Sequence, residues 1–158
     1  MSALNIRDLL SFLVAAKSAT YASENASSSA VPLLPGSKQL EFSEGDFLYR
    51  DIYVGMVCFT GQEIVYASGH PVWSMSYSGG LLPNIPQSSA IEVYSFLRKA
   101  LRSIPEGFPI RGPELLEEKA LCYSCKHSGS IELFHGSEVI TESSVPVYEL
   151  FFSGGKLL

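Results

Sequence analysis

The residues that most suggest binding chemistry stand at alternate positions in one short stretch: Tyr49, Asp51 and Tyr53. If this stretch is a strand, alternation places all three side chains on one face. A carboxylate flanked by two phenols suits a cation or a hydrogen-bonding ring and disfavours anions. The structural alternative is a solvated outer face of a sheet with aromatic pairs across strands.

Two glutamates recur in a second pattern, Phe-x-Gly-x-Glu, at residues 59–63 and 134–138. Because Glu63 and Glu138 occupy the same place in both blocks, a structural role is indicated, such as accepting backbone N–H groups at a glycine bulge. The functional alternative is an acid/base pair across a central cleft. Glu63 is also a candidate ligand-binding residue.

The three cysteines give no sign of a metal or redox centre. Cys122 and Cys125 lie three positions apart in an expected strand, so they point to opposite faces, and Cys58 stands far from them in the sequence. The odd number without a disulfide framework favours a cytoplasmic protein. No nucleophile elbow and no His-Glu-x-x-His motif occurs. We expect no metal and no cofactor.

The chain contains an internal repeat at an offset of 75 residues. Residues 71–80 match residues 146–155 with Pro, Val, Ser and two Gly in common, and the Phe-x-Gly-x-Glu blocks match at the same offset. The sequence therefore predicts one domain over residues 1–158, built from pseudo-repeats at about 5–80 and 89–155. At this offset Phe47, Tyr49, Asp51 and Tyr53 correspond to Cys122, Ser124, Lys126 and Ser128, so only the first half carries the aromatic patch.

Each repeat is expected to begin with a helix and to continue with strands. Asn5 caps the first predicted helix, and Ser89 with Glu92 forms a capping box for the second. Turn-rich connections follow at 24–39 and 106–113. Period-two patterns then predict strands at about 46–54, 56–67, 70–78, 120–128, 130–142 and 145–153.

These elements predict an α+β fold: a duplicated α-β-β-β unit that forms a six-stranded antiparallel sheet with two helices on one face. The glycine blocks at 59–63 and 134–138 are interpreted as bulges that bend the sheet. Trp73, Met75 and Tyr77 recur as large apolar residues in the second repeat, so they are assigned to the core.

Composition excludes several classes of protein. The chain has 158 residues, 46% of them hydrophobic, and a net charge of −5. This content supports a folded core. The negative charge argues against binding of nucleic acid by this chain alone. No apolar segment is long enough to span a membrane.

A set of short motifs carries a family resemblance. They are Ala19-Thr20-Tyr21-Ala22, Pro35-Gly36-Ser37, residues 40–42 and 45–51, Phe59-x-Gly61-x-Glu63, residues 71–77, Arg111-Gly112-Pro113 and Tyr123-x-Cys125. Together they resemble an uncharacterised bacterial domain of unknown function, found alone or fused to a helix-turn-helix DNA-binding domain. The resemblance implies no activity. Arg111, which stands in one of these motifs, is also a candidate ligand-binding residue.

The leading functional hypothesis is a non-enzymatic module that binds or senses a small effector molecule, by analogy with duplicated α+β effector domains. Its candidate ligand-binding residues are Tyr49, Asp51, Tyr53, Glu63 and Arg111. Two alternatives remain open. One is a small hydrolase or isomerase that uses the Asp51/Tyr49 or Glu63/Glu138 groups, and the other is a homodimeric interaction domain without a small ligand.

Overall fold

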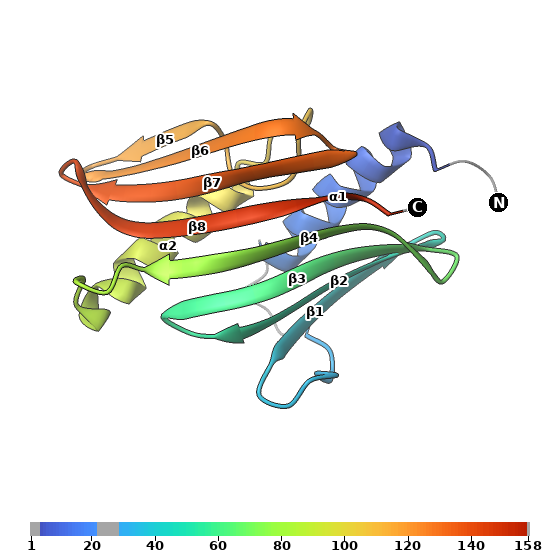
Figure 1. Cartoon of the computed structure of the whole chain (residues 1–158), viewed down its shortest axis with the longest axis horizontal. Coiled ribbons are helices and arrows are strands. Elements are labelled where there is room, and N and C mark those ends of the chain that lie inside the picture. Colours follow the sequence, from blue (N-terminus) through green and yellow to red (C-terminus); the bar gives the residue numbers. More distant parts are fainter. Residues whose placement is uncertain (1–3, 22–28, 158) are drawn as a thin grey trace.

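The computed structural model describes residues 4–21 and 29–157, and within them the chain forms two α-helices and one antiparallel sheet (Figure 1). The first part of the expected connection at 24–39 lies outside these residues. The helices are α1 (Ile6–Tyr21) and α2 (Ala90–Arg102), and a 3₁₀ turn, η2 (Gln87–Ser89), precedes α2. The strands are β1 (Lys38–Glu44), β2 (Phe47–Gly55), β3 (Cys58–Ala67), β4 (His70–Leu81), β5 (Leu115–Glu118), β6 (Leu121–Ser130), β7 (Leu133–Glu142) and β8 (Val145–Lys156).

The sheet has eight strands, so the prediction of six strands is wrong. The six predicted ranges correspond to β2–β4 and β6–β8, and the two missed strands are β1 and β5 at the edges. The expected connection at 24–39 covers the start of β1, and the predicted strands include neither the rest of β1 nor β5, which are short: β1 alternates only over residues 39–43, and β5 does not alternate. β5 has four residues, and most side chains of β1 and β5 are exposed or half-buried. An edge strand is held mainly by its backbone ladder, which leaves little pattern in the sequence.

The two halves of the sheet follow the same path. The strand order is β1-β2-β3-β4-β8-β7-β6-β5, and the β4–β8 pair joins the halves. The β3–β4 ladder shifts register between Val65 and Tyr66, and the β7–β8 ladder shifts between Ile140 and Thr141, 75 residues later. Each half therefore contributes four strands, and the repeating unit that we infer is α-β-β-β-β.

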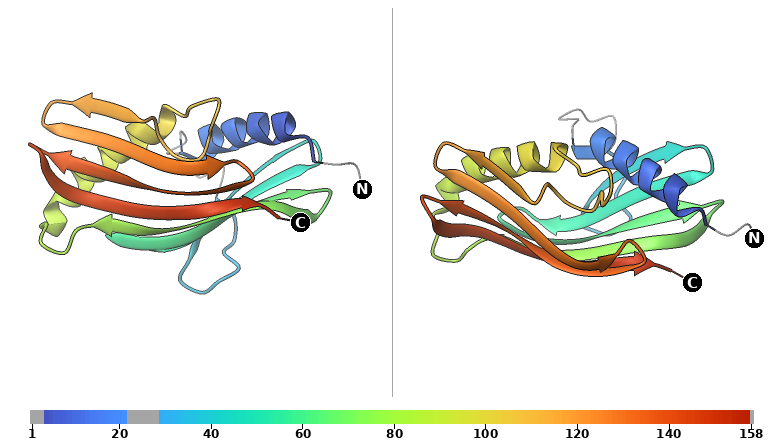
Figure 2. Two further views of the ribbon diagram at one scale, coloured as in Figure 1. Left: turned by 45° about the horizontal axis from the view of Figure 1, so that its top comes forward. Right: turned by 90° about the horizontal axis from the view of Figure 1, so that it is seen from above.

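Both helices lie on the same face of the sheet, which curves beneath them (Figure 2). Apolar side chains of α1, α2 and the inner sheet face form one core. Trp73 is fully buried, as predicted, and its indole Nε1–H donates to the Ile131 carbonyl oxygen at 3.2 Å. Among the described residues, neither helix combines the length and the apolar character that a membrane-crossing helix needs.

Only one of the two predicted helix caps is formed. The Asn5 side chain accepts a hydrogen bond from the Arg7 backbone N–H at 3.0 Å, which confirms the first cap. Ser89 makes no capping hydrogen bond, so the predicted capping box is wrong. The reason is η2, which gives Ser89 helical backbone angles instead of the extended ones that a capping residue needs.

The Phe-x-Gly-x-Glu blocks are not bulges. β3 and β7 run through Gly61 and Gly136 without a register shift. A Cβ atom on Gly61 would lie 2.4 Å from the Tyr77 hydroxyl oxygen, and one on Gly136 would lie 2.5 Å from Cζ of Phe152. Each glycine therefore makes room for an aromatic ring that crosses the inner sheet face, and Tyr77 uses this space to reach β2.

Candidate functional site

The predicted patch on β2 faces the helices and not the solvent. Tyr49 is fully buried, Asp51 is 2% exposed and Tyr53 is half-buried. The alternative of a solvated outer face is therefore wrong. Alternation correctly places the three side chains on one face, but it does not indicate which face the helices cover.

The second half resembles the aromatic patch on β2 more closely than the constant offset of 75 residues suggests. Gly55 pairs with Phe59 in the first hairpin, whereas Gly129 pairs with Phe134 in the second, so the second hairpin is one residue longer. Before this hairpin the matching offset is 74. The counterparts of Tyr49, Asp51 and Tyr53 are consequently Tyr123, Cys125 and His127. The aromatic residue at the first position is kept, and the halves differ at the second and third.

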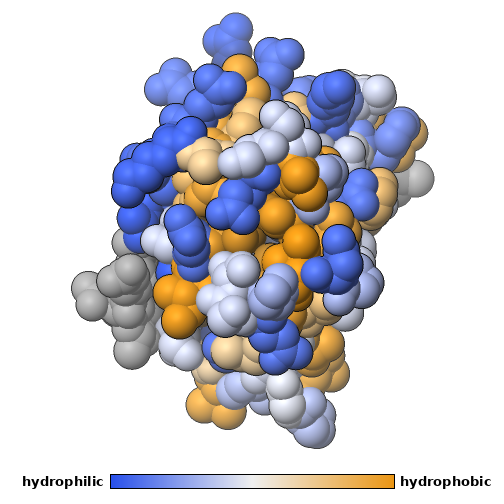
Figure 3. Space-filling view, turned by 90° about the vertical axis from the view of Figure 1, so that its left-hand side faces the viewer, coloured by the Kyte–Doolittle hydropathy of each residue, from blue (hydrophilic) through white to orange (hydrophobic). Residues whose placement is uncertain are grey.

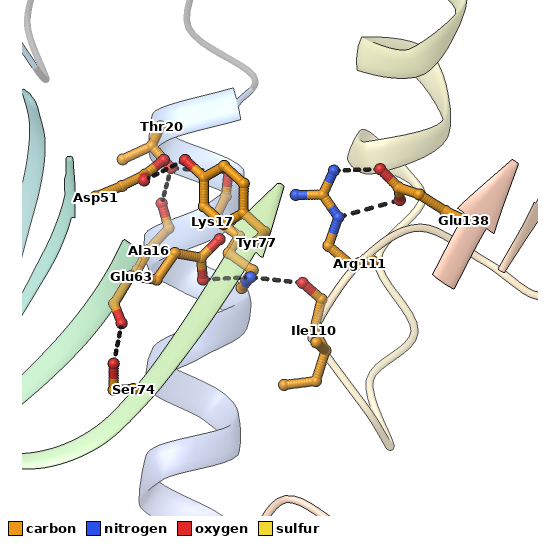
Figure 4. A network of polar contacts seen from close by, with 10 residues as sticks. All are labelled: Ala16, Lys17, Thr20, Asp51, Glu63, Ser74, Tyr77, Ile110, Arg111 and Glu138. Carbon is orange, nitrogen blue, oxygen red and sulfur yellow. Dashed lines mark hydrogen bonds and ion pairs between the residues drawn. The ribbon is translucent and has the colours of Figure 1, made fainter. Parts of the chain in front are cut away.

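Five acidic and basic side chains are buried among the described residues. They are Lys17, Asp51, Glu63, Arg111 and Glu138. Two are basic and three are acidic, and buried charges are stable only when they are paired or neutralised by a proton. Their pairing therefore decides which of them keeps its charge (Figure 4).

Glu63 on β3 pairs with a lysine of α1. The Lys17 Nζ lies 2.6 Å from Glu63 Oε2 and donates a second hydrogen bond to the Ile110 carbonyl oxygen at 2.6 Å. Burial lowers the pKa of Lys17, although the Glu63 carboxylate opposes this shift. Lys17 thus links α1, β3 and the loop that leads to β5.

Glu138 on β7 is held by more partners. Arg111 donates from Nε to Glu138 Oε2 at 3.0 Å and from Nη2 to Oε1, and the hydroxyls of Tyr123 and Tyr148 donate at 2.6 and 2.7 Å. Burial alone raises the pKa of Glu138, but the Arg111 guanidinium and the two phenols outweigh burial and the pKa is lowered. These contacts therefore stabilise the charged form of Glu138, which indicates a structural role.

Asp51 is the third acid, and among the described residues no ion pair joins it to a basic side chain. Its Oδ1 accepts a hydrogen bond from the Tyr77 hydroxyl at 2.7 Å. Burial and the nearby Glu63 carboxylate raise the pKa of Asp51 to about 7, against the lowering effects of Tyr77, Lys17 and Arg111. This carboxyl group therefore gains and loses its proton near neutral pH.

A cavity of about 720 Å³ adjoins Asp51 between the first half of the sheet and the two helices. We call it the Asp51 cavity. Of the predicted site residues, Asp51, Tyr53 and Arg111 line it, and Tyr49 and Glu63 do not. Among the other described lining residues are Thr20, Gln39, Leu40, Met56, Phe59, Tyr77, Tyr94, Leu97, Arg98 and Leu101.

The cavity has a buried polar end and reaches the protein surface elsewhere. Asp51, Tyr77 and Arg111 form the polar end, where the Arg111 guanidinium lies 5.7 Å from the centre of the Tyr77 ring. Met56, in the turn between β2 and β3, lines the cavity and is 71% exposed. Figure 3 views the end of the molecule that carries this turn, where apolar surface gathers between hydrophilic side chains.

Two residues of this region were not among the predicted site residues. Lys17 stands four residues after Leu13 on the apolar stripe of α1, and a lysine at such a position signals a buried partner. Tyr77 was assigned to the core, which is correct for its ring but omits its hydroxyl group. The glycine at position 61, opposite Tyr77 in the ladder, was the available signal.

The cysteines form no cluster with other potential ligands. Cys125 is buried on the inner face, where burial and the Glu138 carboxylate raise the pKa of its thiol to about 11. Within the part of the chain that the structure describes, no three His, Cys, Asp or Glu side chains come together as metal ligands.

Comparison with protein families gives one match. Residues 51–157 match the model of DUF5680, a domain of unknown function. The chain belongs to this family. The DUF5680 segment includes Asp51, Glu63, Tyr77, Arg111 and Glu138, whereas α1 and β1 precede it. Comparisons with curated proteins and with solved structures give no match.

Proposed function

We propose that this protein is a small-molecule-binding module and that its ligand occupies the Asp51 cavity. The observation that carries the proposal is the cavity itself, whose volume of about 720 Å³ is that of a typical ligand site. Its walls combine apolar and aromatic side chains with a few buried polar groups at one end, which is the usual composition of such sites.

The proposal includes a role in regulation. The motifs quoted above resemble a bacterial family whose members occur alone or fused to a helix-turn-helix DNA-binding domain. A module that binds an effector serves both arrangements, because its occupancy can be passed to an attached or a separate partner.

A thermal-shift screen against a library of metabolites tests the proposal. Leu40→Trp places a large ring in the cavity, and Ile52→Trp places the same ring on the opposite face of the sheet as a control. We expect compounds that raise the melting temperature of the wild type and of Ile52→Trp but leave Leu40→Trp unchanged. Equal stabilisation of both variants, or no stabilising compound at all, contradicts the proposal.

One observation favours an enzyme as the second candidate. A carboxyl group with a pKa of about 7 beside a cavity suits general acid/base catalysis. The two candidates differ in the fate of the bound compound. A binding module returns each hit unchanged after long incubation, whereas a hydrolase or isomerase converts it, and mass spectrometry or NMR of the hit distinguishes these outcomes.

A further inference from the structure

We propose that the Asp51 cavity selects an uncharged, planar molecule that carries a paired hydrogen-bond donor and acceptor, such as a carboxamide or a lactam ring. Its polar group would bond to Asp51 at the buried end, and its ring would lie among the aromatic side chains of the wall. The inference rests on the proposed function and names the class of ligand.

The charges at the buried end are already matched without Asp51. Lys17 pairs with Glu63, and Arg111 donates to both carboxylate oxygens of Glu138. A charged Asp51 would be an excess negative charge in a site shielded from water, which is costly. The neutral acid avoids this cost.

The groups that face Asp51 act in opposite directions, and the balance favours the neutral acid. Glu63 on β3 opposes its ionisation, whereas Lys17 on α1, Arg111 in the loop before β5 and Tyr77 on β4 favour ionisation less strongly than burial and Glu63 oppose it. Half-buried Tyr53, the neighbour on the same strand face, has its own pKa raised by burial and by Asp51. The result is a pKa of about 7 for Asp51, so the acid is protonated over most of the range below neutrality.

A protonated Asp51 presents one donor and one acceptor in a plane. Its Oδ1 accepts from Tyr77, which leaves the acid O–H and a remaining lone pair for a partner. A carboxamide offers the complementary C=O and N–H groups at the same spacing. The wall supplies a second element of selection, since Phe59 meets Tyr77 and Tyr94 edge to face, with ring centres 6.1 and 6.0 Å apart. Such aromatic walls favour a flat ring.

Charged ligands fit this lining less well. The basic residues that line the cavity are Lys38, Arg98 and Arg111, and Asp51 is the sole acidic one among the described residues, so a cation finds no negative charge to pair with while Asp51 is protonated. An anion at the buried end meets Asp51 and an Arg111 whose charge is matched by Glu138. Lys38 and Arg98 are exposed, and water and salt screen their attraction for an anion.

Three probes that share a phenyl ring and differ in charge test the inference: benzamide, benzylammonium and benzoate. Their binding is measured by two-dimensional ¹H–¹⁵N NMR titration at pH 6 and pH 8. We expect benzamide to shift the amide signals of Tyr53, Phe59 and Tyr94 and to bind at least tenfold more tightly than the other two at pH 6. Because binding requires protonated Asp51, the affinity for benzamide should be about tenfold lower at pH 8 than at pH 6.

Two variants sharpen the experiment. Asp51→Asn cannot ionise, so binding of benzamide to this variant should no longer depend on pH. Cys125→Ser changes the matching position of the second half and should behave as the wild type.

The outcomes separate the inference from the proposed function. Tighter binding of benzylammonium or benzoate at the same signals overturns the inference and leaves the binding function standing. Failure of all three probes to shift these signals also overturns the inference, and the binding function then stands or falls with the library screen and its Leu40→Trp control.

Discussion

Two cross-strand pairs occupy matching places on the inner sheet face: Asp51 with Glu63 in the first half, and Cys125 with Glu138 in the second. The acids of the two halves differ in how many hydrogen bonds they receive. Glu138 receives hydrogen bonds from a guanidinium and two phenols, whereas Asp51 receives one from Tyr77. The cavity adjoins Asp51 and not Glu138.

This difference separates what the fold requires from what a ligand site adds. A buried glutamate with a basic partner occurs in both halves, so it belongs to the architecture. The additional acid and the tyrosine that reaches it occur in one half, because Cys125 and Phe152 stand at the matching positions. A ligand site is therefore expected where the halves differ.

The largest expected effect comes from neutralising the two glutamates. Glu138→Gln removes the carboxylate to which the buried Arg111 donates, so we expect the free energy of unfolding to fall by about 3–5 kcal/mol. Glu63→Gln should cost at least about 1 kcal/mol less, because Lys17, whose pKa is lowered, can be neutralised by releasing a proton, which arginine does not do. Urea unfolding at pH 7 measures both values. Equal losses would show that the basic partners behave alike.

The next effect is a dependence of stability on pH that Asp51 causes. Its pKa is about 7 in the folded protein and about 3.9 when unfolded. At pH values between these two pKa values, Asp51 holds a proton in the folded state that it has lost in the unfolded state. The free energy of unfolding therefore falls as pH rises. Asp51→Asn removes this loss: it should match the wild type near pH 4 and exceed its stability at pH 8, by on the order of 2–4 kcal/mol.

The difference between the two unfolding curves is the quantity to measure, since it cancels the other titrating groups. A difference that does not change with pH contradicts a raised pKa at Asp51. Cys125→Ser is the matched control and should leave the slope unaltered.

A smaller effect is expected from the two ring-accommodating glycines. Gly61→Ala and Gly136→Ala should each lower the free energy of unfolding by about 1–3 kcal/mol, because the new methyl group overlaps the crossing ring. Only Gly61→Ala should also weaken benzamide binding, since it displaces the Tyr77 hydroxyl from Asp51. If Gly136→Ala weakens binding as much, the site is not confined to the first half.

Much of this arrangement follows from the sequence. Six of the eight strands and both helices lie where hydrophobic periodicity predicts them, because long, half-buried elements carry the strongest patterns. The shared face of Tyr49, Asp51 and Tyr53 follows from alternation alone. β1 and β5 do not follow, since edge strands owe their stability to backbone pairing more than to a buried stripe.

The partners of the buried acids depend on contacts between distant segments. Lys17 and Glu63 are 46 residues apart, and Arg111 and Glu138 are 27 apart. The one additional residue in the second hairpin also changes which positions correspond, and only the ladder registers show it. Sequence patterns indicate that these residues are unusual, but the pairing itself is set by tertiary packing.

The most direct test of the division between the two halves is a titration of side-chain carboxyl groups by ¹³C NMR. The wild-type signals are followed from pH 4 to pH 9, and Asp51→Asn and Glu138→Gln assign them. We predict that the Asp51 carboxyl titrates with a midpoint near the value of about 7, while Glu138, whose pKa is lowered, does not titrate near neutral pH. An Asp51 signal already ionised at pH 5, or a Glu138 signal that titrates near neutrality, would contradict the account.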